Sequence, residues 1–364
     1  MKMFLAPIYL IAILGTLSLQ KVSAQSIERK TLLWENKRAS LGAVLEEKGP
    51  AFIEFRAQNP HMEPIFITDV ITDCGCTTVN YSKDTLKKDQ NASIRLKFDP
   101  DHRGGDFLKM VVVRTNLDIY GDTLFLEGTN IPLPENPNLD YPNRVGNLGF
   151  RLPAVNMGNV FTNEPKLKYV EIYNFGKVPF ALQEKQEIPV HMKISMEPLE
   201  VLPSQRGLLL LTYEGALKKD LGFFEEYLKL KVKGTEEPFS VKVLAVVHEY
   251  FAPVPKSMEK VVPRLGLSEP EINLREISST QKISRTVQLT NLGRETLIIR
   301  KVVSNCDCLE LELASNSLAE GEKTELKLIF DPKGRKGIDY RTITIFSNDP
   351  LVPIRNIVIK SSVK

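Results

Sequence analysis

Short segments in which apolar and polar residues alternate recur along most of the chain. The clearest is 92–98, where Ile94, Leu96 and Phe98 share one face of an extended segment. That alternation is typical of a half-buried strand, and no stretch of useful length has the period of a helix. Many such strands, separated by turns, predict an all-β sandwich or barrel. The other expected strands are residues 51–56, 65–70, 109–114, 122–127, 168–174, 229–233, 240–244, 324–330, 342–346 and 354–360.

Part of this pattern occurs twice. Residues 59–116 match residues 291–348 without a gap and are identical at 14 of 58 positions. A gapless match of this length indicates that the same domain is present in two copies. A third, diverged copy is expected between them, because Asn174 ends a strand 115 residues after Asn59 and 117 residues before Asn291.

Proline-containing segments separate the copies. Residues 132–142 and 253–263 each hold several prolines, which cannot donate to a sheet ladder and which stiffen an extended linker. Each block between them has about 100 residues, the size of one immunoglobulin-like sandwich. We therefore expect three tandem immunoglobulin-like β-sandwich domains, at residues 25–133, 143–251 and 265–364.

The first 24 residues have the composition of a secretory signal peptide. Lys2 precedes an apolar run from 4 to 19, and small residues precede an expected cleavage after Ala24. An uncleaved anchor is the alternative, although the run is short for a membrane span and contains Pro7. The protein is accordingly expected in the periplasm or elsewhere outside the cytoplasm, with no membrane span after cleavage.

The net charge of the chain and the catalytic motifs that it lacks argue against some classes of function. Loss of Lys2 and Lys21 with the signal peptide would lower the formal net charge of +3 by two. A nearly balanced chain argues against nucleic acid as a partner, since phosphate binding needs clustered excess Lys and Arg. No Gly-x-Ser-x-Gly, His-Glu-x-x-His or Gly-x-Gly-x-x-Gly sequence occurs. We expect neither catalysis nor a cofactor, and an enzyme acting on glycans is a distant alternative.

Cysteine occurs only as two Cys-x-Cys pairs, Cys74 with Cys76 and Cys306 with Cys308. On an extended strand, the α-carbons of residues i and i+2 would be ~6.6–6.8 Å apart, near the upper limit for a disulfide. A bend at the middle residue, which glycine allows freely and aspartate tolerates, would shorten that distance. Local disulfides Cys74–Cys76 and Cys306–Cys308 are therefore possible, and rings this small would be strained and relatively easy to reduce.

Three interpretations of these pairs stay open. They can be local structural staples, redox-active disulfides, or thiolate ligands of a soft metal such as Cu(I) or Zn(II). Two sulfurs fill only half of a tetrahedral metal site. His61 and His102 are the only histidines in the first block, and the last block has none. No metal ligand is therefore assigned beyond the four candidate cysteines.

The order of these motifs resembles the bacterial family DUF1573. Here it consists of Asn59, Cys-Gly-Cys-Thr at 74–77, Phe-Asp-Pro at 98–100, Gly105 and Thr-Asn at 115–116. The resemblance covers roughly residues 40–130, and 270–364 more loosely. It implies immunoglobulin-like domains similar to those of major sperm protein and of the ciliary protein hydin. The family is common in exported proteins of Bacteroidetes-type bacteria, and the resemblance implies no established activity.

The last block departs from the motif within the cysteine loop. Asp307 replaces the glycine and Leu309 replaces the threonine, so the sequence favours Cys74 and Cys76 as the more credible pair. The leading hypothesis is an exported cell-envelope scaffold or interaction protein, whose partners are envelope proteins or surface polymers. The alternative hypothesis is a thiol redox or soft-metal-binding protein that uses the Cys-x-Cys pairs.

Overall fold

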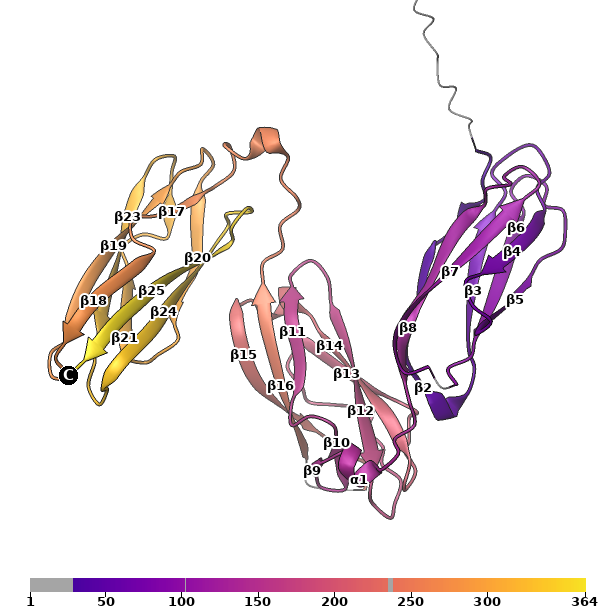
Figure 1. The fold of residues 1–364 in the computed structure, drawn as a ribbon, viewed down its shortest axis with the longest axis horizontal. Coiled ribbons are helices and arrows are strands. Elements are labelled where there is room, and N and C mark those ends of the chain that lie inside the picture. Colours follow the sequence, from indigo (N-terminus) through magenta and orange to yellow (C-terminus); the bar gives the residue numbers. More distant parts are fainter. Residues whose placement is uncertain (1–28, 102, 235–237) are drawn as a thin grey trace, which may run out of the picture. The chain divides into compact units, whose positions relative to one another are not determined.

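The computed structural model describes residues 29–101, 103–234 and 238–364. The expected signal peptide, residues 1–24, and His102 lie outside these ranges. Within them nearly all regular structure is β-strand (Figure 1), which confirms the all-β fold class. None of the helices in the described ranges has the length and apolar character needed to cross a membrane. The chain divides between Leu133 and Pro134 into two compact units.

The first unit is a sandwich of two four-stranded sheets, with strand orders β1-β3-β6-β5 and β2-β8-β7-β4. Its core lies between them, and Ile94, Leu96 and Phe98 are each at most 1% exposed, which confirms the inward face predicted from alternation. Its elements are β1 (Leu33–Trp34), β2 (Arg38–Leu45), the 3-10 turn η1 (Glu46–Lys48), β3 (Ala51–Gln58), β4 (Ile67–Thr72), β5 (Thr77–Tyr81), β6 (Asn91–Phe98), β7 (Gly105–Thr115) and β8 (Asp122–Ile131).

The second unit contains two hydrophobic cores, each between a pair of sheets. The sheets of the first pair have strand orders β13-β14-β12-β10-β9 and β11-β16-β15. The elements around this core are α1 (Pro137–Asp140), β9 (Asn143–Val145), β10 (Leu148–Phe150), β11 (Val155–Phe161), β12 (Lys166–Asn174), β13 (Met192–Glu197), β14 (Arg206–Tyr213), α2 (Gly215–Lys218), β15 (Gly222–Leu230) and β16 (Phe239–His248).

The second pair of sheets has strand orders β17-β19-β23-β21 and β18-β25-β24-β20-β22. The division of this unit into two domains, at the boundaries expected from the sequence, stays a prediction. The remaining elements are η2 (Lys256–Met258), β17 (Leu265–Leu267), β18 (Glu271–Ile277), β19 (Ile283–Asn291), β20 (Leu297–Ser304), β21 (Leu309–Leu313), β22 (Ser317–Leu318), β23 (Lys323–Phe330), β24 (Gly337–Ser347) and β25 (Ile354–Val363).

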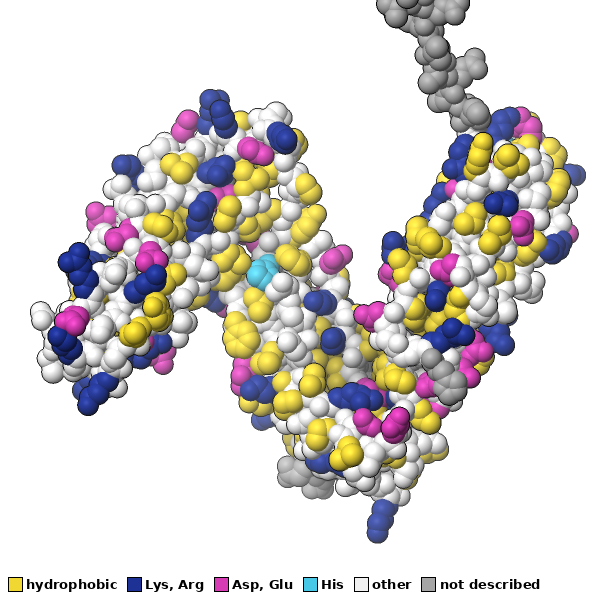
Figure 2. All heavy atoms as spheres, viewed as in Figure 1, with side chains coloured by type: hydrophobic (Ala, Val, Ile, Leu, Met, Phe, Trp, Pro, Cys, Tyr) yellow, Lys and Arg dark blue, Asp and Glu magenta, His cyan; other side chains and the backbone are white. Residues whose placement is uncertain are grey.

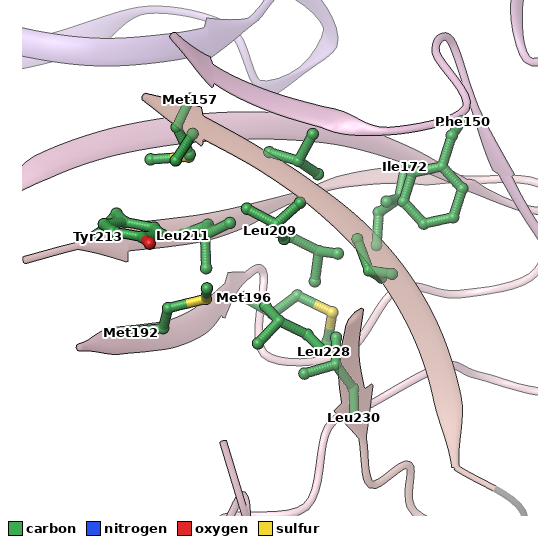
Figure 3. Close-up of a cluster of buried hydrophobic side chains, with 14 of the residues drawn as sticks. Phe150, Met157, Ile172, Met192, Met196, Leu209, Leu211, Tyr213, Leu228 and Leu230 are labelled. Atoms are coloured by element: carbon green, nitrogen blue, oxygen red, sulfur yellow. The ribbon is translucent and has the colours of Figure 1, made fainter. Parts of the chain in front are cut away.

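Two strands of the middle block show where the alternation pattern failed. The expected strand at 229–233 was wrong: β15 begins at Gly222 and ends at Leu230. Strand β14 was not expected, because its Leu-Leu-Leu-Leu run does not alternate. The strand lies between β12 and β13 and is buried on both faces, so its middle is a continuous apolar run. Its side chains Leu209, Leu211 and Tyr213 reach the same core as residues of β15 (Figure 3).

A buried asparagine turn occurs at the three positions that the sequence aligned. Asn59, Asn174 and Asn291 are each at most 1% exposed. In all three, Nδ2 donates to the carbonyls four and 27 residues later, and Oδ1 accepts from the backbone N–H two residues later. These bonds are 2.8–3.0 Å long. The asparagine therefore closes the same turn in all three blocks, which explains why the middle block also has asparagine at this position.

A second shared feature is a bulge in the parallel strand pairs β2–β8, β11–β16 and β18–β25. One residue at each bulge has positive φ: 66° at Gly42, 62° at Gly158 and 58° at Arg275. Its N–H is held by the side chain two residues earlier at 2.8–3.0 Å. Glycine adopts this conformation without cost, whereas an L-residue loses roughly 1–2 kcal/mol. Arg275 therefore occupies a position better suited to glycine.

Replacement of Arg275 by glycine is expected to stabilise the last block by up to ~1 kcal/mol, since relief of the left-handed conformation outweighs the extra chain entropy of glycine. The matched change in the opposite direction, Gly158→Ala, should cost ~1 kcal/mol in the middle block. Denaturant unfolding of the full chain checks both values. A loss of stability in Arg275→Gly would show that the arginine side chain contributes more than its backbone costs.

Candidate functional site: the two cysteine loops

The first cysteine pair lies in the loop from β4 to β5. The α-carbons of Cys74 and Cys76 are 5.3 Å apart and their sulfurs form a disulfide. The loop is fixed at both ends, because Asp73 exchanges hydrogen bonds with the backbone of Met110 on β7. The N–H of Asp99, in the Phe-Asp-Pro turn, donates to the carbonyl of Cys76 at 2.9 Å. Two of the motifs, Cys-Gly-Cys-Thr and Phe-Asp-Pro, thus meet at this loop.

The side chain that contacts both sulfurs of this disulfide is neutral. Cys76 is only 3% exposed and packs in the core, while Cys74 is partly exposed. Both sulfurs lie near the hydroxyl of Thr77, whose Oγ1 is 3.8 Å from Cys74 Sγ and 3.9 Å from Cys76 Sγ. Thr72 Oγ1 donates to the carbonyl of Cys74 at 3.1 Å. Thr77, the threonine of the motif, therefore places a buried hydroxyl group beside both sulfurs.

The second pair lies in the equivalent loop, from β20 to β21. Cys306 and Cys308 also form a disulfide, with α-carbons 5.1 Å apart. Asn305 bonds to the backbone of Thr342 on β24, and the N–H of Asp331 donates to the carbonyl of Cys308 at 2.9 Å. Despite Asp307 and Leu309, the last loop is therefore anchored by the same backbone hydrogen bonds as the first.

The two loops differ in what faces the sulfurs. Arg335 Nη2 donates to Cys306 Sγ at 3.0 Å, and the backbone N–H of Cys308 donates to the same sulfur at 3.0 Å. Arg335 follows the Asp-Pro turn, and its own N–H donates to the carbonyl of Pro332. In the gapless alignment of the two copies, Arg335 is identical to Arg103, and the sequence shows no further role for it. Its role depends on contact across 29 residues, which no local pattern reveals.

The local pairing bears on the metal interpretation. All four cysteines are in disulfides, so a soft metal would bind only after reduction. In the described ranges, no group of three or more His, Cys, Asp and Glu side chains is placed to hold a metal ion. His61 has a different partner: its Nε2 lies 3.0 Å from the carbonyl oxygen of Thr31.

A polar cluster in the middle block was not expected from the sequence. Glu226 on β15 accepts hydrogen bonds from Lys218 at 2.7 Å and Tyr213 at 2.8 Å, and lies 3.1 Å from His191 Nε2. Burial alone would raise the pKa of this carboxyl group, but its three partners together hold the pKa below the usual value. Burial, followed by the bond to the carboxylate, raises the pKa of Tyr213. The cluster is thus an internally satisfied group that joins β14, β15 and α2.

The sandwich sheets and the repeated cysteine loops define a protein of immunoglobulin-like architecture. The family model described as "Protein of unknown function (DUF1573)" matches residues 32–130 and 265–363, more than half of the chain. The chain belongs to this family, and the two matches confirm the two recognisable copies expected from the repeat.

Several solved structures match parts of the chain at low sequence identity. A protein of unknown function from Porphyromonas gingivalis W83 is 17% identical; the match covers 60% of this chain and all of that one, with a TM-score of 0.43. Three immunoglobulin domains of titin match 92% of this chain and 98% of theirs, at 12% identity and a TM-score of 0.19. WR4, a major-sperm-protein family member of C. elegans, matches 28% of this chain and 97% of its own, at 17% identity and a TM-score of 0.20. A search of curated proteins found no match.

Proposed function

We propose that this chain is an exported scaffold of the cell envelope that acts by binding other molecules rather than by catalysis. Two features support export and assembly: the signal-like sequence of residues 1–24, and the repetition of one sandwich frame along the chain. Sandwich domains in series present several sheet edges and loops, and such surfaces commonly bind extended segments of other proteins.

The observation that carries this proposal is an edge strand in the middle block that has a partner on one side alone. In the first unit β7 lies between β8 and β4, and in the last block β24 lies between β25 and β20. By contrast, among the strands of the described ranges β15 is paired only with β16, and it stands at the margin of its sheet in Figure 1. The segment that would pair with it, residues 183–187, reads Gln-Glu-Lys-Gln-Glu and forms no strand. Gln183 donates to the carbonyl of Lys231, just past the end of β15, at 2.9 Å. The five consecutive polar residues have no apolar face to bury, so no strand continues from there along β15 itself.

This edge combines free backbone with exposed aromatic side chains. Among the described residues, the backbone of 222–230 makes hydrogen bonds only within the ladder to β16. Phe223 is 64% and Tyr227 is 59% exposed, and apolar side chains are visible in Figure 2 where Figure 1 places β15. An added strand would gain main-chain hydrogen bonds from the edge and side-chain selectivity from the two aromatic residues. The proposed partner is therefore an extended, partly apolar segment of another envelope protein.

Site-specific photo-crosslinking in the producing cells tests the proposal. A photoreactive phenylalanine analogue is placed at Tyr227, and the matched control places it at Met110. Met110 is 48% exposed on β7, where it pairs with Phe125 of β8 on one side and bonds to Asp73, just after β4, on the other. Crosslinks from 227, but not from 110, to one recurring segment of an envelope protein are expected. No adduct at 227, or equal adducts at both positions, would reject the edge as the binding surface.

A second candidate function is thiol redox chemistry. It is supported by the pairing of all four cysteines within their own loops, since such small rings are relatively easy to reduce. Cys74 and Cys306 are partly exposed, so an external thiol has access to each loop. The two candidates are compatible, because the cysteine loops and β15 belong to different sheets of the chain.

A further inference from the structure

We propose that Cys306–Cys308 is a reducible disulfide whose reduced form is stabilised by Arg335, so that it is reduced more readily than Cys74–Cys76. This inference rests on the redox candidate above and deepens it. It reverses the preference drawn from the sequence, because the loop that departs from the family motif carries the charged partner.

The guanidinium of Arg335 faces a poor acceptor while the disulfide is intact. A disulfide sulfur accepts hydrogen bonds only weakly, whereas a thiolate is an anion that pairs well with a cation. Cys306 Sγ already receives two donors at 3.0 Å, from Arg335 Nη2 and from the N–H of Cys308. Cleavage of the sulfur–sulfur bond would turn both contacts into charge-assisted hydrogen bonds. The site is therefore better matched to reduced Cys306 than to the disulfide.

The neighbouring carboxylate does not neutralise this arginine. Arg335 Nε is 3.9 Å from Asp339 Oδ2 and is buried without a hydrogen-bond partner in the described structure. Arg341 also bonds to Asp339, with Nε 3.1 Å from Oδ2, so two arginines share one carboxylate. Asp307, between the cysteines, is exposed, and water weakens its effect on the sulfur. The charge nearest to Cys306 Sγ is thus positive.

The first loop provides the comparison within the same molecule. Its sulfurs lie near a neutral hydroxyl, that of Thr77. Arg103, at the position equivalent to Arg335, is exposed, and no hydrogen bond among the described residues joins its side chain to either sulfur. A thiolate formed at Cys74 would therefore lack the cationic partner that Cys306 has.

The reaction is a thiol–disulfide exchange with an external dithiol. A thiolate of the dithiol attacks Cys308 Sγ and forms a mixed disulfide. The electron pair of the broken bond stays on Cys306 Sγ, beside Arg335 Nη2. The second thiol of the dithiol, once deprotonated, attacks the mixed disulfide and displaces Cys308 as a thiolate, which takes up a proton. The dithiol is oxidised to a disulfide and the protein pair is reduced, and a stabilised leaving group at Cys306 favours this direction.

Redox titration of the full-length protein tests the inference. The chain is equilibrated with mixtures of reduced and oxidised dithiothreitol, the free thiols are alkylated, and mass spectrometry quantifies each pair separately. In the wild type, Cys306–Cys308 should be reduced at a lower ratio of reduced to oxidised reagent than Cys74–Cys76. Arg335→Gln should raise the ratio needed by about tenfold, or ~30 mV for a two-electron couple, while Arg335→Lys should retain part of the effect.

The matched control is Arg103→Gln, which should shift neither pair, and thermal unfolding establishes that each variant is folded. If both pairs are reduced but Arg335→Gln leaves the Cys306–Cys308 ratio unchanged, the role of Arg335 is rejected while the redox candidate stands. If neither pair is reduced in the folded protein at any ratio, both are rejected. An equal shift from Arg103→Gln would also overturn the assignment to Arg335.

Discussion

Replacement of Arg206 by methionine is expected to destabilise the middle block by about 3–5 kcal/mol, because it leaves a buried carboxylate without its main partner. Arg206 is 3% and Glu171 is 9% exposed, and Arg206 Nη1 donates to Glu171 Oε1 at 2.7 Å. Arg151 also bonds to Glu171, but its side chain is 39% exposed and water competes for it. Tyr141, fully buried, donates its hydroxyl to the same carboxylate.

Two further variants separate the buried charge from the lost packing. Arg206→Met combined with Glu171→Gln should recover about half of the loss, since the remaining amide is neutral and still accepts from Tyr141. Arg38→Met removes an exposed ion pair with Glu127 and should cost about 1 kcal/mol or less. Denaturant unfolding, with hydrogen exchange to locate the change, measures all three. A cost for Arg206→Met as small as that for Arg38→Met would show that Glu171 is satisfied without it.

Replacement of Asn291 by alanine is expected to cost about 3 kcal/mol, because a buried side chain loses its hydrogen bonds to three backbone groups at once. Asn291 Nδ2 donates to the carbonyls of Glu295 and Leu318 at 2.8 and 3.0 Å, and its Oδ1 accepts from the N–H of Gly293 at 3.0 Å. The side chain is 1% exposed, so water cannot replace it. Asn291→Asp should cost at least as much at neutral pH, since its carboxylate would face two carbonyl oxygens.

The control for this prediction is Asn356→Ala. Asn356 is exposed on β25, in the other sheet around the same core, so the same substitution there should change the free energy of unfolding little. Hydrogen exchange in the full chain should show faster opening around residues 291–320 in Asn291→Ala alone. A stability change in Asn291→Ala within that of Asn356→Ala would mean that the turn is held by its backbone and not by the side chain.

The two disulfide loops show how residues distant in sequence change the meaning of a motif. By sequence, Asp307 and Leu309 made the last loop a weaker version of the first. In the structure the loop keeps its frame and exchanges a buried hydroxyl for the guanidinium of Arg335. The last loop thus keeps its disulfide, and the group that contacts Cys306 Sγ is a cation instead of a neutral hydroxyl.

The sequence by itself determined the all-β fold class and the two family copies of this protein. Alternation placed Ile94, Leu96 and Phe98 inside a strand, because successive side chains of a strand point to opposite faces. The gapless repeat identified two copies of one domain, since insertions would have broken the common turns. Asn174 marked the relation of the middle block, because its turn needs one specific side chain and not a general pattern.

Only the tertiary structure decided which side chains meet. Strand β14 is buried on both faces, so apolar and polar residues do not alternate along it and alternation could not predict it. Arg335 reaches Cys306, and Arg206 reaches Glu171, across 29 and 35 residues. The edge of β15 is open because residues 183–187, which would lie beside it, do not form a strand. Each of these is a relation between segments brought together by folding, whereas alternation and motif spacing record only what neighbouring residues require.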